Sequence, residues 1–221
     1  MKKIEIKEFG GPEVLEVKNA DIGKPGQNEV LVKNSSIGIN YIDTYHRSGL
    51  YPIPLPSGIG LEACSIIEEV GSEVKLFKVG DRVTRASMPI GTYSEKQIIP
   101  EDKLVKVPDN ISDEVASCIT LKGITAEYLL HRTYQVKKGD KILYHAAAGA
   151  LGQIFCPWAN ALGAEIIGTV GSDEKIEIAK KNGCHHVINY NEKNFVEEIE
   201  KIVGKNGLDV VYDGVGAKTF E

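Results

Sequence analysis

The chain has 221 residues, enough for one large domain or two modest ones, and 42% of them are hydrophobic. Its 26 basic and 31 acidic residues give a formal net charge of −5, which argues against nucleic-acid binding because that depends on clustered Lys and Arg. No apolar run approaches the ~20 residues of a membrane-spanning helix, and the alternating N-terminus lacks the apolar centre of a signal peptide. We therefore expect a soluble, cytoplasmic globular protein.

The first half of the chain, to about Val107, consists of short alternating or apolar runs separated by turn residues. We expect strands at residues 4–9, 29–37, 64–70, 81–84 and 92–99. Strands at this spacing are typical of a compact all-β barrel or sandwich. One short helix is expected over residues 41–48, before a loop that three prolines make irregular.

After Pro108 the pattern changes to strands that alternate with helices. Ser112 is expected to cap a first helix, and a second helix is expected over residues 123–133. Strands at 142–146, 165–170, 186–189 and 208–213 then alternate with helices at 149–162, 173–182 and 195–203. This alternation predicts βαβ crossovers and a parallel sheet. The fold class is therefore α/β, with a β-barrel-type domain at residues 1–120 and an incomplete doubly wound sheet at 121–221.

A glycine loop joins the first of these strands to its helix. The loop reads Ala147-Ala148-Gly149-Ala150-Leu151-Gly152, which is a dinucleotide-binding loop with its first glycine replaced. A glycine at 149 lets a pyrophosphate approach the backbone, and a glycine at 152 lets helix and strand pack closely. We assign Gly149, Ala150, Leu151 and Gly152 to cofactor binding; the alternative is that the small residues serve helix–strand packing alone.

The residues after the strand expected at 165–170 bear on which nicotinamide cofactor is bound. An NAD site usually places Asp or Glu there, about 20 residues past the loop, to accept from the ribose 2′-hydroxyl. Here Gly171 and Ser172 are small and neutral, and Lys175 lies in the first helical turn, where a bound 2′-phosphate would offset its unfavourable charge. This pattern predicts NADPH. Asp173 keeps NADH open, and in the structural alternative Ser172 or Asp173 caps the helix and Lys175 points to water.

Six collinear blocks make the chain similar to one known family. They are residues 38–45 (GINYIDTY), 47–52 (RSGLYP), 56–63 (PSGIGLEA), 121–126 (LKGITA), 147–152 (AAGALG) and 187–190 (VINY). The chain resembles the zinc-independent, zeta-crystallin-like quinone oxidoreductases of the medium-chain dehydrogenase/reductases. The resemblance implies a GroES-like domain at 1–120, a Rossmann domain at 121–221, and transfer of reducing equivalents from NADPH to a quinone. The alternatives are an NADPH-dependent reductase of α,β-unsaturated carbonyls and a non-catalytic NADPH-binding protein or inactive fragment.

The resemblance also implies which side chains surround the nicotinamide and the acceptor. It places Asn40, Asp43, Tyr45 and Tyr51 around both, Thr125 near the nicotinamide, and Tyr190 on the adenosine side. Structural alternatives remain. Asn40 would suit a helix cap, and Tyr45 and Tyr51 would pack their rings while their hydroxyls contact water. For Asp43 we expect a structural role, paired with Arg47 at i, i+4.

No metal site is expected. The zinc-dependent relatives carry Cys where this chain has Asn40 and His where it has Leu61, and neither an amide nor an alkyl group is a zinc ligand. The four cysteines, at positions 64, 118, 156 and 184, have no CxxC spacing and are expected to be buried, reduced thiols.

The C-terminal part is expected to be truncated. A doubly wound sheet of this class has strand order 3-2-1-4-5-6, and the last strand we expect, at 208–213, is the fourth. Its edge would be open and apolar, and the family's homodimer contact, made by the sixth strand, would be missing.

Overall fold

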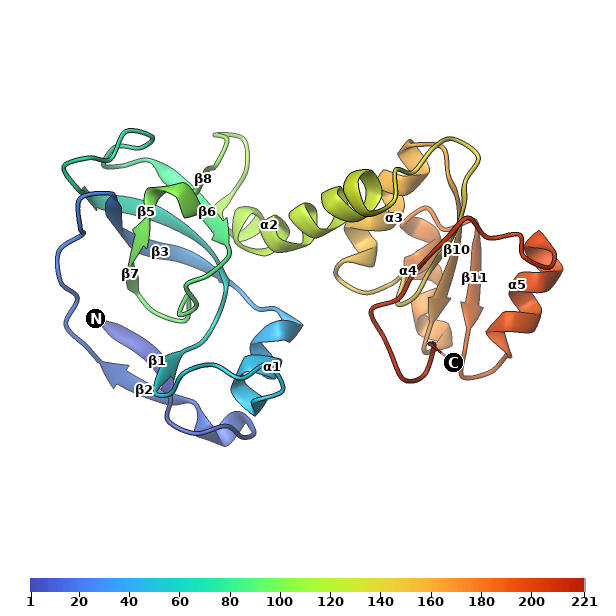
Figure 1. Ribbon diagram of the computed structural model, residues 1–221, viewed down its shortest axis with the longest axis horizontal. Coiled ribbons are helices and arrows are strands. Elements are labelled where there is room, and N and C mark those ends of the chain that lie inside the picture. Colours follow the sequence, from blue (N-terminus) through green and yellow to red (C-terminus); the bar gives the residue numbers. More distant parts are fainter. Residues whose placement is uncertain (221) are drawn as a thin grey trace. The chain divides into compact units, whose positions relative to one another are not determined.

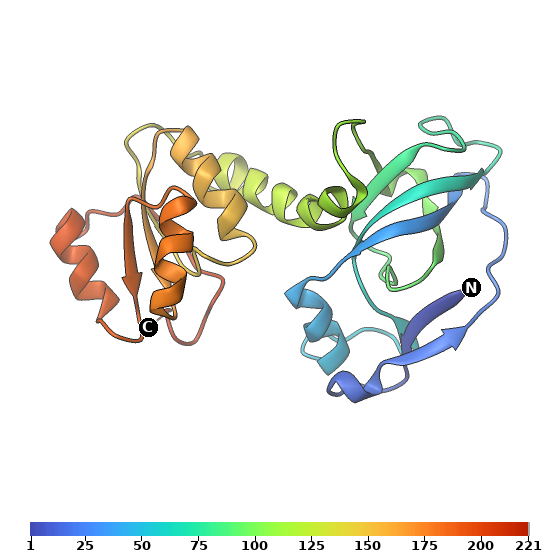
Figure 2. The same cartoon turned by 180° about the vertical axis from the view of Figure 1, so that it is seen from behind.

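The computed structural model describes residues 1–220 and divides into two compact units (Figures 1 and 2). The first unit is Met1–Leu121 and the second begins at Lys122. Each unit has its own sheet and its own apolar core. No helix within residues 1–220 combines the length and the apolar character needed to cross a membrane.

The first unit is built on a five-stranded antiparallel sheet with the order β7-β3-β5-β6-β8. Its strands are β3 (Glu29–Gly38), β5 (Glu62–Val70), β6 (Arg82–Ala86), β7 (Lys96–Pro100) and β8 (Val105–Lys106). Alternate side chains of these strands, including Val30, Val32, Ile67, Val83 and Ile99, form the core, because successive residues of a strand face opposite sides of the sheet.

A smaller sheet with the order β2-β1-β4 completes the unit. Its strands are β1 (Lys2–Ile6), β2 (Glu16–Asn19) and β4 (Ser57–Gly58), and helix α1 spans Tyr41–Ser48, as expected. We did not expect β2 or β4. Neither has an apolar run, and each forms by pairing with β1, which only the tertiary fold brings close.

The two helices expected after Ser112 are one. Helix α2 runs over Asp113–Tyr128 and continues into a π-helical turn at Leu129–Thr133. The Ser112 hydroxyl oxygen accepts from the Val115 N–H at 3.3 Å, as an N-cap does. Gly123 lies inside the helix, where it costs about 1 kcal/mol relative to alanine but does not break it.

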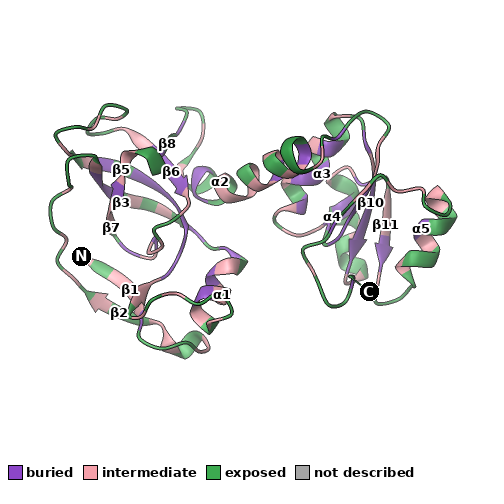
Figure 3. Ribbon diagram, in the orientation of Figure 1, coloured by how far each residue is buried: buried purple, intermediate pink, exposed green. Residues whose placement is uncertain are grey.

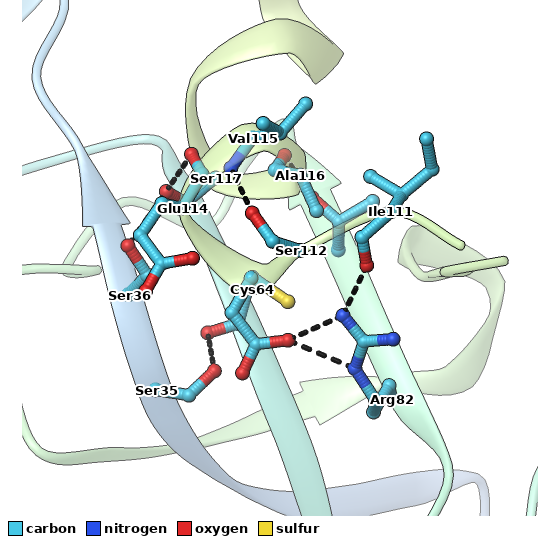
Figure 4. A network of polar contacts seen from close by, with 12 residues as sticks. Ser35, Ser36, Cys64, Arg82, Ile111, Ser112, Glu114, Val115, Ala116 and Ser117 are labelled. Carbon is cyan, nitrogen blue, oxygen red and sulfur yellow. Dashed lines mark hydrogen bonds and ion pairs between the residues drawn. The ribbon is translucent and has the colours of Figure 1, made fainter. Parts of the chain in front are cut away.

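Arg82 of β6 anchors the start of α2 to the sheet (Figure 4). Its guanidinium donates to the Asp113 carboxylate at 2.8 and 2.6 Å and to the Ile111 carbonyl at 2.5 Å. Hydrogen bonds from Ser35 and from Arg82 hold the pKa of Asp113 below its usual range. This network fixes the beginning of the helix.

The second unit is a parallel sheet of four strands with the order β11-β10-β9-β12. The strands are β9 (Lys141–Tyr144), β10 (Glu165–Val170), β11 (His186–Asn189) and β12 (Val210–Tyr212). Numbered within this unit, the order is 3-2-1-4, which confirms the expected α/β fold class. Within residues 1–220, β12 pairs only with β9, and Val211 on it is half exposed.

Helices cover both faces of this sheet, whose strands are largely buried (Figure 3). Helix α3 (Gly152–Ala161) contributes Phe155 to the core on one face, with Ile142 and Ile166 of the sheet. Helix α5 (Phe195–Val203) packs Ile199 against Leu143 on the other. The helix expected at 173–182 is a 3-10 turn, η4 (Asp173–Lys175), followed by α4 (Ile176–Lys181).

The cysteine expectation is wrong at one position. Cys64, Cys156 and Cys184 are buried and reduced, but Cys118 of α2 is exposed. Burial raises the pKa of the Cys64 thiol to about 11, so that thiol is protonated and unreactive at neutral pH.

Candidate functional site

The glycine loop of the second unit makes a sharp turn between β9 and α3. Ala146 has φ 59°, in the left-handed region that non-glycine residues seldom occupy, and the Gly149 N–H donates to its carbonyl at 2.8 Å. Because this turn continues to Leu151, α3 begins at Gly152 and not at 149 as expected. The loop residues 147–151 therefore lie between the end of β9 and the first residue of α3.

Both predicted glycines sit where a side chain would meet the backbone. A Cβ added at Gly152 would lie 2.4 Å from the Ala147 carbonyl oxygen, and one added at Gly149 would lie 3.0 Å from the Ala146 oxygen. The first approach is a direct clash, and the second is tight. Gly152 thus permits the close approach of loop and helix, in the role expected for it.

The loop offers unpaired hydrogen-bond donors. Within residues 1–220, the N–H groups of Ala148, Ala150 and Leu151 donate to no acceptor, and all three residues are half-buried or exposed. Free N–H groups at a helix start bind anions, because the helix dipole adds positive charge there. This part of the site therefore fits a pyrophosphate.

The end of β10 forms the second part of the same half-site. A Cβ on Gly171 would lie 2.8 Å from the Tyr190 hydroxyl, so the glycine lets the tyrosine ring close against the strand end. The Tyr190 N–H donates to the Val170 carbonyl at 3.1 Å, and the Asn191 amide donates to the Gly171 carbonyl at 2.7 Å. The structure thus brings Gly171 and Tyr190 together.

Asp173 and Lys175 differ in what they contact. The Asn189 amide donates to the Asp173 carboxylate at 2.8 Å, so the acid that would accept from a ribose 2′-hydroxyl already has a partner inside the protein. Lys175 is exposed and, among the residues described, forms no ion pair. The Ser172 side chain does not cap the 3-10 turn that follows it. Two small neutral residues, the exposed acids Asp173 and Glu174, and the exposed Lys175 therefore follow the end of β10.

In the first unit, the residues expected near the acceptor lie on helix α1 and immediately before and after it. Asn40 immediately precedes the helix and is 7% exposed; its N–H donates to the Asp43 carboxylate at 2.9 Å. The Asn40 amide Nδ2 donates to Glu62 Oε2 at 2.8 Å. The Asn40 side chain thus contacts a buried carboxylate from β5 and also forms a capping box with Asp43 at the start of α1, as the structural alternative expected.

Tyr45 and Tyr51 lie together, as a shared site requires. Their ring centroids are 5.2 Å apart in an edge arrangement, and Tyr41 packs edge-on against Tyr45 at 5.3 Å. Gly49, with φ 81°, ends α1 and turns the chain back, so that the Tyr51 N–H donates to the Tyr45 carbonyl at 3.2 Å. Tyr51 remains half exposed and is able to contact a ligand.

Asp43 has the structural role we expected, but with another partner. The i, i+4 pair does not form, because the Arg47 guanidinium donates to the Gly10 carbonyl at 3.2 Å. Asp43 is 3% exposed, and its Oδ2 accepts from the Tyr93 hydroxyl at 2.9 Å as well as from Asn40. Burial raises the pKa of Asp43 above its usual range.

Glu62 is the residue that sequence reasoning missed. It is fully buried at the start of β5, where Oε1 accepts from the Leu121 N–H at 2.7 Å and Oε2 from Asn40. In the sequence, the signal for a buried carboxylate at this position is a single acidic residue between the apolar residues Leu61 and Ala63. Such a charge stays buried only when it is hydrogen-bonded.

Thr125 lies on α2, among the first residues of the second unit. Within residues 1–220, no three of the His, Cys, Asp and Glu side chains gather as metal ligands would. Leu61 is buried.

A GroES-like β domain followed by a parallel sheet with a glycine loop defines a nicotinamide-dependent oxidoreductase of the medium-chain class. Residues 26–109 match the family described as alcohol dehydrogenase GroES-like domain, and residues 150–221 match the one described as zinc-binding dehydrogenase. A quinone oxidoreductase of Pseudomonas aeruginosa is 48% identical over 221 residues, 100% of this chain and 68% of that protein. The chain belongs to the quinone oxidoreductase family of the medium-chain dehydrogenase/reductases.

Two further relatives bear on the chemistry. A 2-haloacrylate reductase of Burkholderia is 46% identical over 223 residues, which cover 98% of this chain and 67% of that protein. The structure of Escherichia coli quinone oxidoreductase complexed with NADPH superposes with a TM-score of 0.95 at 49% identity, covering 98% of this chain and 67% of that one. The chain thus spans about two thirds of the length of these relatives.

Proposed function

We propose that the protein transfers reducing equivalents from NADPH to a quinone. The observation that carries this proposal is the half-site of the second unit, where unpaired N–H donors face one side of the glycine loop and Lys175 stands unpaired near the end of β10. The family membership supports it, since relatives of this similarity are named quinone oxidoreductases and one was solved with NADPH.

The residues of the second unit fit this cofactor. The N–H groups of Ala150 and Leu151 would hold the pyrophosphate, and Ser172, Lys175 and Tyr190 would hold the 2′-phosphate and adenosine, with Thr125 toward the nicotinamide. When bound, NADPH supplies the reducing equivalents. The exposed cation of Lys175 favours NADPH over NADH, because it is able to pair with a 2′-phosphate that NADH lacks.

The residues of the first unit would orient the acceptor. Tyr45 and Tyr51 offer an aromatic face on which a planar quinone would stack, and the Asn40 amide would fix one of its polar groups or those of the nicotinamide. Positioning lowers the barrier by removing the entropy of bringing two reactants together. Asn40 and Leu61 are not zinc ligands, so we propose that the reaction proceeds without zinc.

The 2-haloacrylate reductase relative favours a second candidate, reduction of an α,β-unsaturated carbonyl. Both reactions use the same cofactor half-site and differ in the acceptor. We further propose that the protein acts in the cytoplasm on a small-molecule acceptor, with the acceptor side in residues 1–120 and the cofactor side in 121–221.

Turnover of the purified chain tests the proposed function. We expect NADPH oxidation, followed at its near-ultraviolet absorbance, to accelerate when a simple benzoquinone is added and to exceed the rate with an unsaturated ketone. A higher rate with the ketone would favour the second candidate. Saturable NADPH binding without turnover on either acceptor would contradict both and support a non-catalytic protein.

Replacing Lys175 with alanine is expected to weaken NADPH binding about tenfold and to leave NADH binding unchanged. The loss corresponds to about 1.4 kcal/mol, as expected for one charge-assisted contact to a phosphate. Fluorescence titration with each cofactor measures both affinities. Lys180→Ala serves as the control. It removes a lysine of α4 whose Nζ lies 2.9 Å from Glu177 Oε1. Equal losses for NADPH and NADH in Lys175→Ala would contradict the assigned contact.

A further inference from the structure

The carboxylate of Glu62 lies outside the residues assigned so far, yet it contacts one of them directly. Glu62 is 0% exposed, and both of its oxygens are engaged by donors from two other segments. Because Oε2 accepts a hydrogen bond, the NH2 end of the neighbouring amide turns toward it. That neighbour is Asn40.

The position of the Glu62 carboxylate is itself fixed. Oε1 accepts from the Leu121 N–H at 2.7 Å, a backbone donor that cannot rotate away. On the other side, Gly38 makes room for the carboxylate, because a Cβ there would lie 2.9 Å from Oε2 and 1.9 Å from the Ser117 carbonyl oxygen. Oε2 is therefore held in place to receive the Asn40 amide.

The Asn40 side chain has two ends of opposite hydrogen-bonding character. Its Nδ2 donates to Glu62 Oε2 at 2.8 Å, and the backbone of Asn40 is fixed by the bond from its N–H to Asp43 at 2.9 Å. The Asn40 side chain also forms a capping box with Asp43 at the start of α1. With Nδ2 on Glu62, the carbonyl oxygen lies on the side away from Glu62, toward the first turn of α1.

The geometry points to Glu62 as the positioning residue of the acceptor site: through the Nδ2–Oε2 hydrogen bond it holds Asn40 with its carbonyl oxygen, and not its NH2 group, on the side away from β5. This inference rests on the proposed function for its consequence, since the orientation of Asn40 then sets how substrate or nicotinamide is held. Glu62 is fully buried, and in this proposal it acts through Asn40.

Glu62→Gln tests the inference with almost no change of shape. The introduced glutamine has one oxygen and one NH2 group, whereas the Leu121 N–H and the Asn40 NH2 group are both donors. With its oxygen accepting from the Leu121 N–H, its NH2 faces the Asn40 NH2, and the Asn40 amide must turn over. We expect kcat with a benzoquinone to fall about tenfold, because misplaced orienting groups cost rates of this order, while the dissociation constant for NADPH changes less than about twofold.

A second substitution distinguishes positioning from general support of the fold. In the double variant Asn40→Asp with Glu62→Gln, the NH2 group of the introduced glutamine donates to one oxygen of the introduced aspartate, whose other oxygen stands where the Asn40 carbonyl oxygen stood. We expect this double variant to recover at least half of the lost rate. Asn40→Asp alone places two carboxylates together, so its kcat should be lower than that of Glu62→Gln and of the double variant. Glu68→Gln, which removes a carboxylate of the same strand that is paired with Lys96 at 2.6 Å, is the matched control and should keep full kcat.

A direct readout keeps the inference testable if the chain proves inactive. The side-chain N–H signals of Asn40, observed by NMR in asparagine-labelled full chain, should include one proton shifted downfield by the carboxylate, and that shift should vanish in Glu62→Gln but not in Glu68→Gln. An unchanged Asn40 signal, or a Glu62→Gln variant with full kcat in an active protein, would overturn the inference. Absence of quinone turnover in the unsubstituted chain would instead reject the proposed function and leave the NMR result to decide the orientation of Asn40.

Discussion

Replacing Gly152 with alanine is expected to weaken NADPH binding about a hundredfold. The added Cβ would lie 2.4 Å from the Ala147 carbonyl oxygen and 2.7 Å from its carbon, and both are backbone atoms that cannot rotate away. The loop must move by about an ångström to reach ordinary contact distance. That shift misplaces the N–H groups of Ala150 and Leu151 relative to the pyrophosphate. Hydrogen bonds to a charged group contribute about 1.5–3 kcal/mol each, so one or two lost bonds account for the change.

Two matched substitutions distinguish a change in loop packing from a direct effect on phosphate binding. A Cβ at Gly149 comes within 3.4 Å of the Ala146 oxygen alone, at 3.0 Å. We therefore expect Gly149→Ala to weaken NADPH binding by obstructing the phosphate while the thermal midpoint changes little. Gly152→Ala should lower the midpoint as well, because overpacking typically costs about 1–3 kcal/mol. Gly23→Ala, where no atom lies within 4 Å, is the control. Unaltered NADPH affinity in Gly152→Ala, measured by calorimetric titration, would show that the pyrophosphate binds elsewhere.

Elements with strong local patterns are predicted well from the sequence. Strands Glu165–Val170 and His186–Asn189 and helix Phe195–Val203 have the bounds we expected, because burial periodicity and capping residues such as Asn194 are local properties. The glycine loop is found for the same reason. Its required spacing, strand before and helix after all lie within about a dozen consecutive residues.

Features that depend on distant pairing are missed. Strand β2 (Glu16–Asn19) has no apolar run and exists through its register with β1. Asp43 was expected to pair with a neighbour on its own helix, but the Tyr93 hydroxyl, 50 residues away in sequence, donates to it. Glu62 meets Asn40 across 22 residues. A carboxylate's partner is set by which segments the sheet brings together, which spacing along one helix does not reveal.

Helix α2 shows a different limit. The sequence predicts a break between two helices near Gly123, yet the helix continues over Asp113–Tyr128. A single glycine costs about 1 kcal/mol in a helix, and packing and hydrogen bonds along a long helix outweigh this. Composition alone does not decide between a break and a tolerated glycine, because the deciding energy is tertiary.

Replacing Asp43 with alanine is expected to lower the free energy of unfolding by about 3 kcal/mol. The substitution leaves two donors, the Asn40 N–H and the Tyr93 hydroxyl, without the oxygen that accepts from both at 2.9 Å. Each buried donor left unsatisfied costs about 1–3 kcal/mol. Because Asn40 and helix α1 lose their anchor, quinone turnover should fall with stability. Urea denaturation followed by circular dichroism measures the first effect.

Asp43→Asn should destabilise the fold less than Asp43→Ala does. The Asn40 N–H and the Tyr93 hydroxyl both donate to Oδ2 of Asp43, and an asparagine keeps one such oxygen. The asparagine carbonyl oxygen is able to take the place of Oδ2, and the NH2 group that of Oδ1, which has no hydrogen-bond partner among residues 1–220. We expect this variant to lose about 1–2 kcal/mol at neutral pH, less than Asp43→Ala, because both donors keep their acceptor while the buried NH2 group stands where the described residues offer no partner. Asp43→Asn as damaging as Asp43→Ala would mean that the negative charge, and not the accepting oxygen, holds α1.

The pH dependence provides an independent check on the same residue. Burial raises the pKa of Asp43 in the folded protein above its ordinary value of 3.8, although the nearby His46 opposes the rise and Glu62 adds to it. Within the window above pH 3.8 the folded state binds more protons at this site than the unfolded state does, so the contribution of Asp43 to stability is present at low pH and is lost as pH rises through the raised pKa. The asparagine of Asp43→Asn does not titrate. The free energy of unfolding of the unsubstituted protein, minus that of Asp43→Asn, should therefore decrease from about pH 4 upward and then level off. A difference that increases with pH would mean that the folded environment stabilises the Asp43 carboxylate as an anion, and that burial is outweighed by its hydrogen bonds.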